Sequence, residues 1–136
     1  MKKEDCIFCK IVQGELPSRT IYEDGDFRVI LDLKPVTRGH ALILAREHAD
    51  NLYELPEETA GKAMILARRL AGIFREKLHC DGLNLMQNNG EVAGQTVTHF
   101  HLHMIPRYEG DGQEINLVPG EATQEELEAV RKQITE

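Results

Sequence analysis

Short apolar runs separated by turn residues occupy the first third of the chain. Residues 20–22 and 27–31 are β-prone runs on either side of residues 23–26, which contain an Asp-Gly turn signal. We predict a hairpin from these two runs. A further apolar run at residues 40–45 predicts a third strand, because Pro and Gly mark the preceding residues 34–39 as a loop.

After Pro56 the apolar positions recur at spacings of three and four instead. This spacing predicts an amphipathic helix, with acidic residues in its first turn and basic residues in its last, as the helix dipole favours. The apolar positions that define the stripe are Ala63, Leu66, Leu70, Ile73, Phe74 and Leu78.

The rest of the chain returns to strand character and then ends in a helical pattern. Residues 83–87 and 97–105 are predicted strands, and Pro106 is expected to end the second one. Thr123 and Glu126 match a capping box that opens a short C-terminal helix. Strands outnumber helices and are mostly sequential neighbours, so we expect an α+β class with a largely antiparallel sheet. No repeat or linker divides residues 1–136, which predicts a single domain.

Composition and charge exclude several functions. The 136 residues are 41% apolar, enough for a core, and 16 basic against 23 acidic residues give a net charge of −7. This balance argues against a protein that grips nucleic-acid backbones or anionic lipids. Every apolar run is far shorter than the roughly 20 residues that cross a bilayer. The first residues show no secretory signal, so we expect a cytoplasmic protein with neither nucleic acid nor membrane as a partner.

The segment most informative about chemistry holds three of the six histidines. His99, His101 and His103 alternate with apolar residues, and this period of two puts the three imidazoles on one face of a strand. Three such donors could hold a catalytic zinc. They could instead supply a nucleophile and proton-transfer groups, since imidazole titrates near neutral pH. The spacing alone leaves both chemistries open.

The loop that precedes the histidines favours phosphoryl chemistry. Residues 88–96 are rich in Asn and Gly and offer backbone N–H groups, side-chain amides and a hydroxyl. Such donors suit phosphate oxygens. An imidazole nucleophile beside them would form a labile N–P bond without any divalent metal.

The motif His99-x-His101-x-His103-Met104-Ile105 resembles the signature of the histidine triad family. Four further features support the resemblance, which covers residues 6 to about 107 and leaves 108–136 as a C-terminal extension. They are residues 94–97 upstream of the histidines, Asp32 eight residues before His40, the pair Gly39-His40 before an apolar run, and residues 6–11 at the start.

The resemblance implies a fold, an assembly and an activity. Each subunit would form a five-stranded antiparallel sheet with one long helix, and two subunits would join into a ten-stranded sheet as a homodimer. The family hydrolyses or transfers nucleoside monophosphate groups, preferably of purines. By this resemblance His101 would attack the α-phosphate of a purine nucleotide or nucleoside phosphoramidate and carry a transient nucleotidyl group.

The resemblance also implies roles for residues around the histidines. His103 and the Thr96 hydroxyl would hold phosphate oxygens, with Asn88 and Gly94 completing the cradle. The remaining roles are Gln95 near the bridging atom, Asp32 on the ribose hydroxyls, Leu31 and Leu33 on the base, and His40 as a fourth histidine near the triad.

The pair Cys6-x-x-Cys9 admits three interpretations: a redox pair, packed core thiols, or half of a structural zinc site. A redox pair needs a preceding strand, for which the five residues before Cys6 leave no room. His79, beside Cys80, is one candidate for completing a zinc site, whereas the resemblance to bacterial members points to other histidines. We therefore expect a structural Zn²⁺ at Cys6, Cys9, His48 and His99. We expect no organic cofactor.

The resemblance, together with the N-terminal cysteine pair, implies a nucleoside phosphoramidate hydrolase of the Hint-like branch. Three alternatives remain: a Fhit-like hydrolase of dinucleoside polyphosphates, a purine-nucleotide-binding module with incidental turnover, and a metallohydrolase that uses the three alternating histidines as zinc ligands. Turnover, chelation and a covalent adduct discriminate among them.

Overall fold

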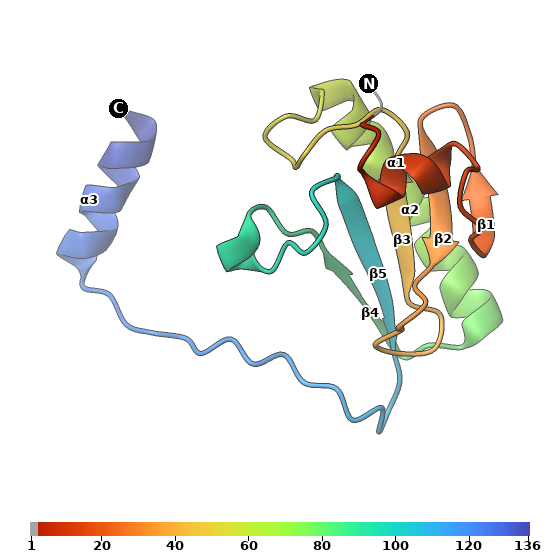
Figure 1. Cartoon of the computed structure of the whole chain (residues 1–136). Helices are drawn as coiled ribbons and strands as arrows, with labels where there is room; N and C mark the ends of the chain where they lie inside the picture. The colour runs from red at the N-terminus through yellow and green to blue at the C-terminus, as the bar shows by residue number, and fades with distance from the viewer. Residues whose placement is uncertain (1–2) are drawn as a thin grey trace.

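Five antiparallel strands form one sheet in the order β1-β2-β3-β5-β4 (Figure 1). The computed structural model describes residues 3–136, so Met1 and Lys2 of the predicted domain lie outside the described residues. In chain order the elements are α1 (Ile7–Val12), β1 (Thr20–Glu23), β2 (Phe27–Leu31), β3 (Ala41–Ala45), α2 (Glu57–Leu78), β4 (Gly82–Met86), the short 3₁₀ helix η1 (Glu91–Ala93), β5 (His101–Arg107) and α3 (Gln124–Thr135). The predicted α+β class with a five-stranded antiparallel sheet is confirmed.

The predicted hairpin forms between β1 and β2, because Asp24 caps its turn. The Asp24 carboxylate accepts the backbone N–H groups of Asp26 and Phe27, both at 2.8 Å. β2 then pairs along its whole length with β3, whose five residues are all buried. An all-apolar strand such as β3 fits the centre of a sheet that is covered on both faces.

The long helix α2 covers one face of the sheet. Alternate residues of the central strands point toward it, among them Val29, Ile43 and Met104, and form the main core. The helix contributes the buried residues Ala63, Leu66, Ala67, Leu70 and Phe74. Ile73, which the sequence pattern assigned to this stripe, is instead 46% exposed.

The short helix α1 covers one end of the opposite face, where it packs on Leu42 and Leu44 of β3. His101 pairs with Leu44 and His103 with Leu42, so both histidines share this second face. Because α1 covers only part of it, His101 is buried and His103 is half-buried. The edge of α1 therefore decides how much solvent the histidines meet.

The strand predicted at residues 97–105 is displaced along the chain. β5 begins at His101, and His99 lies in a turn where its N–H donates to the Val97 carbonyl at 2.9 Å. Pro106 was predicted to end the strand but lies inside it, paired with Leu83. The β3–β5 pairing stops at Met104, so the missing N–H of Pro106 costs no ladder hydrogen bond on that side.

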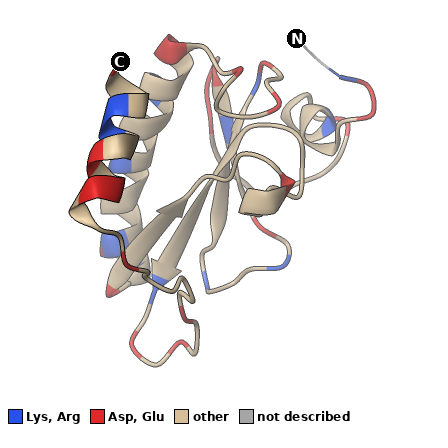
Figure 2. Ribbon diagram, turned by 90° about the vertical axis from the view of Figure 1, so that its left-hand side faces the viewer, with Lys and Arg blue, Asp and Glu red and all other residues tan. Residues whose placement is uncertain are grey.

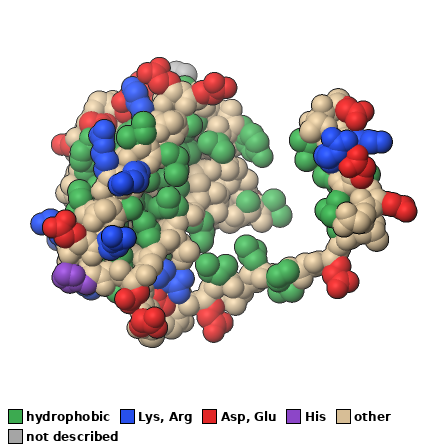
Figure 3. Space-filling view, turned by 180° about the vertical axis from the view of Figure 1, so that it is seen from behind, with side chains coloured by type: hydrophobic (Ala, Val, Ile, Leu, Met, Phe, Trp, Pro, Cys, Tyr) green, Lys and Arg blue, Asp and Glu red, His purple; other side chains and the backbone are tan. Residues whose placement is uncertain are grey.

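The C-terminal helix α3 begins with the predicted capping box, and Thr123 and Glu126 make both of its hydrogen bonds. All twelve of its residues are exposed, and an extended segment carries the helix away from the sheet (Figures 1 and 3). Figure 2 shows that charged residues gather on the helices and loops. Within residues 3–136, no helix combines the length and the apolar character needed to span a membrane.

Candidate active site and metal site

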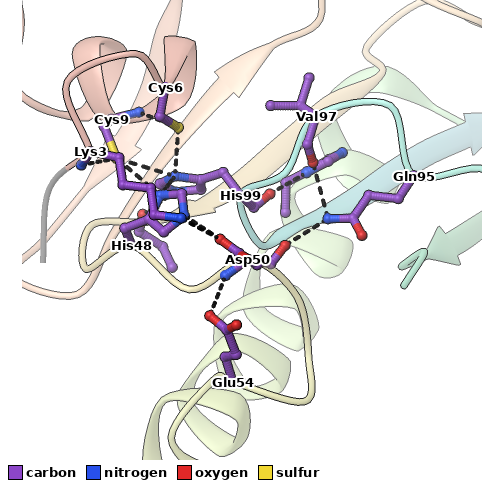
Figure 4. Close-up of polar contacts among 11 residues, drawn as sticks. Lys3, Cys6, Cys9, His48, Asp50, Glu54, Gln95, Val97 and His99 are labelled. Atoms are coloured by element: carbon purple, nitrogen blue, oxygen red, sulfur yellow. Dashed lines mark hydrogen bonds and ion pairs between the residues drawn. The ribbon is translucent and has the colours of Figure 1, made fainter. Parts of the chain in front are cut away.

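Four predicted metal ligands converge between α1, the loop after β3 and the turn before β5 (Figure 4). The sulfur of Cys6 lies 3.3 Å from Nδ1 of His99, and the sulfur of Cys9 lies 3.2 Å from Nδ1 of His48. The two Nδ1 atoms are 3.2 Å apart. These separations match the edges of a tetrahedron with metal–ligand bonds of about 2.0–2.3 Å. The donor set fits a closed, structural zinc site.

Both histidines of this cluster turn a lone pair toward its centre. Nε2 of His99 lies 2.7 Å from the Ala45 carbonyl oxygen, which only accepts, so Nε2 carries the ring proton. Nε2 of His48 likewise donates to the Asp50 carboxylate at 2.7 Å. Nδ1 of each ring is therefore free to bind a metal, with the outward hydrogen bond fixing the tautomer.

Burial makes the cluster costly to charge unless a cation is present. It raises the pKa of the Cys6 thiol and, as the largest cause, lowers the pKa of His99 to about 4. His99 is completely buried. A divalent cation would balance the thiolate charges that this environment otherwise disfavours.

Asp50 is a residue that the sequence patterns did not single out. Its carboxylate accepts from His48 and, at 3.2 Å, from the Lys3 ammonium, while its carbonyl accepts from Gln95 Nε2 at 2.6 Å (Figure 4). The hydrogen bond from His48 is the largest cause that lowers the pKa of Asp50. The spacing His48-x-Asp50 was the available signal, because a carboxylate two residues from a ligand can reach its outer nitrogen.

A second histidine cluster lies on the same face of the sheet. Nε2 of His40 is 3.0 Å from Nδ1 of His103 and 3.7 Å from the Asp32 carboxylate. The rings of His103 and His101 are 5.0 Å apart between centroids. Phe8, from α1, stands edge-on to both His99 and His101, with centroid distances of 5.8 and 5.0 Å, and separates the two clusters.

Hydrogen bonds fix the tautomers of this second cluster as well. The Val36 N–H donates to Nδ1 of His40 at 3.0 Å, so the neutral His40 carries its proton on Nε2 and donates it to Nδ1 of His103. The proton of His103 therefore sits on Nε2. Because Nε2 of His40 is a donor, the Asp32–His40–His103 group forms a hydrogen-bond relay and lacks the inward lone pairs of a metal site.

His101 carries its proton on the other ring nitrogen from His40 and His103. Its Nδ1 lies 2.7 Å from the His99 carbonyl oxygen, so Nδ1 carries the proton and Nε2 keeps its lone pair. Burial is the largest cause lowering the pKa values of His101, His40 and His103, the last to about 4. All three rings are thus neutral at pH 7. The site presents a neutral nucleophile next to a neutral N–H donor.

The predicted phosphate loop is held by its own side chains. Nδ2 of Asn88 lies 3.5 Å from the Gly94 carbonyl, and Gly94 has a left-handed φ of 95°. The Gln95 amide donates to the carbonyls of Asp50 and Val97 and accepts from the Gly90 N–H at 2.8 Å. In this structure Gln95 therefore ties the loop to the metal site, and its contact with a bridging atom stays a prediction.

Four other predicted residues lie outside the histidine relay. Thr96 lines two cavities of about 380 and 610 Å³ that flank the Cys/His cluster, so its contact with phosphate also stays a prediction. Leu33 is 84% exposed beside Asp32, whereas Leu31 packs against the core on the α2 face and is not brought to the histidines. His79 is exposed at the end of α2 and takes no part in the metal cluster.

Comparison with known proteins assigns the fold and the motif to one family. The family described as HIT domain matches residues 13–110. The chain belongs to the HIT family. Its HIT domain is 41% identical over 102 residues to the adenosine 5′-monophosphoramidase HNT1 of Saccharomyces cerevisiae, covering 75% of this chain and 62% of the yeast protein.

Two solved structures extend the comparison to nearly the whole chain. The crystal structure of SMU.412c from Streptococcus mutans has a TM-score of 0.93 at 37% identity, covering 98% of this chain and 85% of that one. A Zn-bound histidine triad family protein from Mycobacterium smegmatis has a TM-score of 0.78 at 41% identity, covering 96% and 95%. The first match includes the region of α3.

Proposed function

We propose that this protein hydrolyses purine nucleoside phosphoramidates at the α-phosphate, with His101 as the nucleophile. The observation that carries the proposal is the 2.7 Å hydrogen bond from His101 Nδ1 to the His99 carbonyl, which leaves a lone pair on Nε2. The similarity to a yeast adenosine monophosphoramidase supports the reaction class.

The proposed reaction has two displacement steps. First, Nε2 of His101 bonds to phosphorus while the P–N bond breaks and the amine leaves after taking up a proton. The His99 carbonyl shares the positive charge that develops on the imidazole. Water then displaces Nε2 from phosphorus, releasing the nucleoside monophosphate and a proton and restoring neutral His101.

The neighbouring groups have supporting roles in this proposal. Nε2–H of His103, fixed by the relay from His40, is the donor for a phosphate oxygen. Asp32 would accept the ribose hydroxyls and Leu33 would contact the base. Asn88, Gly94, Gln95 and Thr96 would complete the phosphate cradle once substrate is bound.

We also propose that Cys6, Cys9, His48 and His99 hold a structural Zn²⁺. When bound, the metal would supply rigidity, fixing α1 and the turn at His99 whose carbonyl orients His101. With all four positions filled by protein ligands, no coordination site is left for substrate. The Zn-bound relative from M. smegmatis supports this assignment.

A homodimer is part of the same proposal. β4 is an edge strand, and its Leu85 and Met86 are 41% and 43% exposed. On α2, Met64 and Ile65 also expose apolar side chains, at 54% and 55%. Pairing of two β4 edges would cover this surface and form the predicted ten-stranded sheet. Light scattering of the purified chain should give twice the monomer mass.

The decisive experiment is mass spectrometry of the zinc-loaded protein quenched during turnover of adenosine 5′-phosphoramidate. We expect an added adenylyl mass on His101 in the wild type and none in His101→Ala. His79→Asn, a substitution of an exposed histidine, is the matched control and should keep both adduct and turnover.

Other outcomes would identify the alternatives. Turnover that survives His101→Ala but falls on chelation would mean that the alternating histidines form a metallohydrolase site. Faster cleavage of diadenosine polyphosphates than of the phosphoramidate would favour the Fhit-like activity. Tight nucleotide binding without turnover would leave only a binding module.

A further inference from the structure

Residues 107–113 form a tight turn after β5 that is organised by one carboxylate. Asp111 accepts two hydrogen bonds from the Arg107 guanidinium, at 2.8 and 3.1 Å. It also accepts the backbone N–H groups of Tyr108 and Gln113, at 3.0 and 2.9 Å. The hydrogen bond from Arg107 is the main cause that holds the pKa of Asp111 well below its usual range. The turn is thus fixed by charge-assisted hydrogen bonds.

Two side chains of this turn reach the loop that precedes β3. The Tyr108 hydroxyl donates to the Arg38 carbonyl at 2.8 Å, and Gln113 Nε2 donates to the Val36 carbonyl at 3.2 Å. The Arg38 guanidinium lies over the Tyr108 ring, 5.5 Å from its centroid. The backbone at residues 36 and 38 is therefore held from outside the loop by directional contacts.

The same stretch of backbone orients His40. Val36 donates its N–H to His40 Nδ1, and the His40 N–H donates to the Thr37 carbonyl at 3.1 Å. Gly39 has a φ of +91°, and a Cβ there would lie 2.5 Å from Leu78 Cδ1, so the chain follows a closely fitted path. A displaced Val36 would loosen its contacts with Gln113 and with His40 together.

We propose that the turn of residues 107–113 positions the catalytic histidine relay, with Tyr108 and Gln113 as positioning residues. Gln113 holds the Val36 carbonyl, and Tyr108 holds the Arg38 carbonyl of the same loop. Val36 holds Nδ1 of His40, and His40 Nε2 donates to His103. Within residues 3–136 neither side chain is hydrogen-bonded to His103, so both act through the loop. The kinetic consequence rests on the proposed function, whereas the orientation of His40 does not.

The test compares Tyr108→Phe and Gln113→Ala with Tyr53→Phe in the full-length, zinc-loaded protein. Tyr53→Phe removes the same hydroxyl from a side chain that is 86% exposed. ¹⁵N shifts of the imidazole nitrogens report the tautomer of His40, which a purely structural role of the turn would leave unmoved. Turnover of adenosine 5′-phosphoramidate gives kcat and KM separately.

We expect both variants to lower the population of the Nε2–H tautomer of His40. Loss of one such hydrogen bond should lower kcat by about two- to tenfold, with a smaller change in KM. The Tyr53→Phe control should match the wild type in both readouts. Gln113→Ala changes an exposed side chain and keeps the proposal testable if Tyr108→Phe folds poorly.

Two results would overturn the proposal. One is that both the His40 tautomer and kcat stay as in the wild type in both variants. The other is a fall in kcat with no change at His40, since the turn would then act by a different route. A wild-type protein without turnover would instead contradict the proposed function, and the ¹⁵N shifts would still decide the positioning.

Discussion

The two histidine clusters on one face of the sheet differ in which ring nitrogen the protein ties down. In the Cys/His cluster, His48 and His99 donate Nε2–H outward to oxygens, which leaves both Nδ1 lone pairs facing inward. In the relay, His40 receives a backbone N–H and passes its own proton toward His103. Which ring nitrogen keeps its lone pair, and so whether a histidine can bind a metal or donate a proton, is thus decided by one hydrogen bond to each ring.

The clusters are also physically linked through one residue. His99 is a proposed metal ligand through Nδ1, and its carbonyl orients His101. Residues two apart on the chain therefore belong to different clusters. We infer that the metal acts on turnover indirectly, by holding the carbonyl that sets the tautomer of His101.

The largest effect that separates the clusters should come from His101→Ala. Removing the proposed nucleophile should lower kcat for adenosine 5′-phosphoramidate by about 10³-fold or more. The thermal midpoint should move by only a few degrees, because the metal cluster remains intact. Steady-state kinetics and calorimetry on the same samples check both expectations. Retention of a tenth of the activity would contradict the division of roles.

Metal removal should affect the thermal midpoint more than it affects the chemical step. Chelation should lower the thermal midpoint by more than about 10 °C, because metal-binding free energy contributes to folding free energy. Scanning calorimetry with and without chelator, after zinc has been quantified, makes the measurement. Cys80→Ser is the control, since this thiol lies outside the cluster and should leave the zinc content at one per chain. A midpoint insensitive to chelator would mean that the cluster is only packed thiols and imidazoles.

A smaller effect should follow from Asp50→Asn, which leaves all four proposed metal ligands in place. The amide is a weaker partner for the His48 Nε2–H than the carboxylate, so zinc affinity should fall about 10- to 100-fold. Competition with a chromophoric chelator measures the change. Asp26→Asn removes an exposed carboxylate that pairs with Lys62 and should leave the affinity unchanged. Equal zinc affinities in the two variants would mean that Asp50 does not support metal binding.

The last expected effect is a pH dependence of stability from His103. Burial, His101 and His40 lower its pKa to about 4, while Asp32 opposes the shift. The unfolded histidine titrates near 6.5. The stabilising contribution of neutral His103 is therefore complete above about pH 6.5 and is lost as pH falls toward 4.

Denaturant titrations between pH 7 and 4.5 test this sign. The free energy of unfolding of the wild type should fall more steeply than that of His103→Gln, by at most about 1.4 kcal/mol per pH unit. Comparison of the two proteins cancels the contribution of the metal ligands, which both retain. Parallel curves would mean that His103 is not held neutral by the fold.

Patterns along the chain predicted part of the fold and of the site correctly. Strict alternation identified His101 and His103 on one face, and the apolar run at residues 40–45 identified the central strand, which spans Ala41–Ala45. The same alternation placed the start of β5 too early. His99 continues the alternation of histidine and apolar residues, but it lies in a turn and does not pair with a neighbouring strand. Six-residue α1 was missed, since it is too short to show a helical period.

Sequence alone determined the residue types of both clusters, the antiparallel sheet and the long helix, because periodicity and local turn chemistry are properties of neighbouring residues. Only the tertiary structure decided the tautomers. Ala45, Asp50 and Val36 contribute the oxygens and the N–H that fix the rings of His99, His48 and His40. Two of these three are backbone groups, which every residue type carries apart from the N–H that proline lacks. Only the folded path of the chain therefore reveals which histidine meets which group.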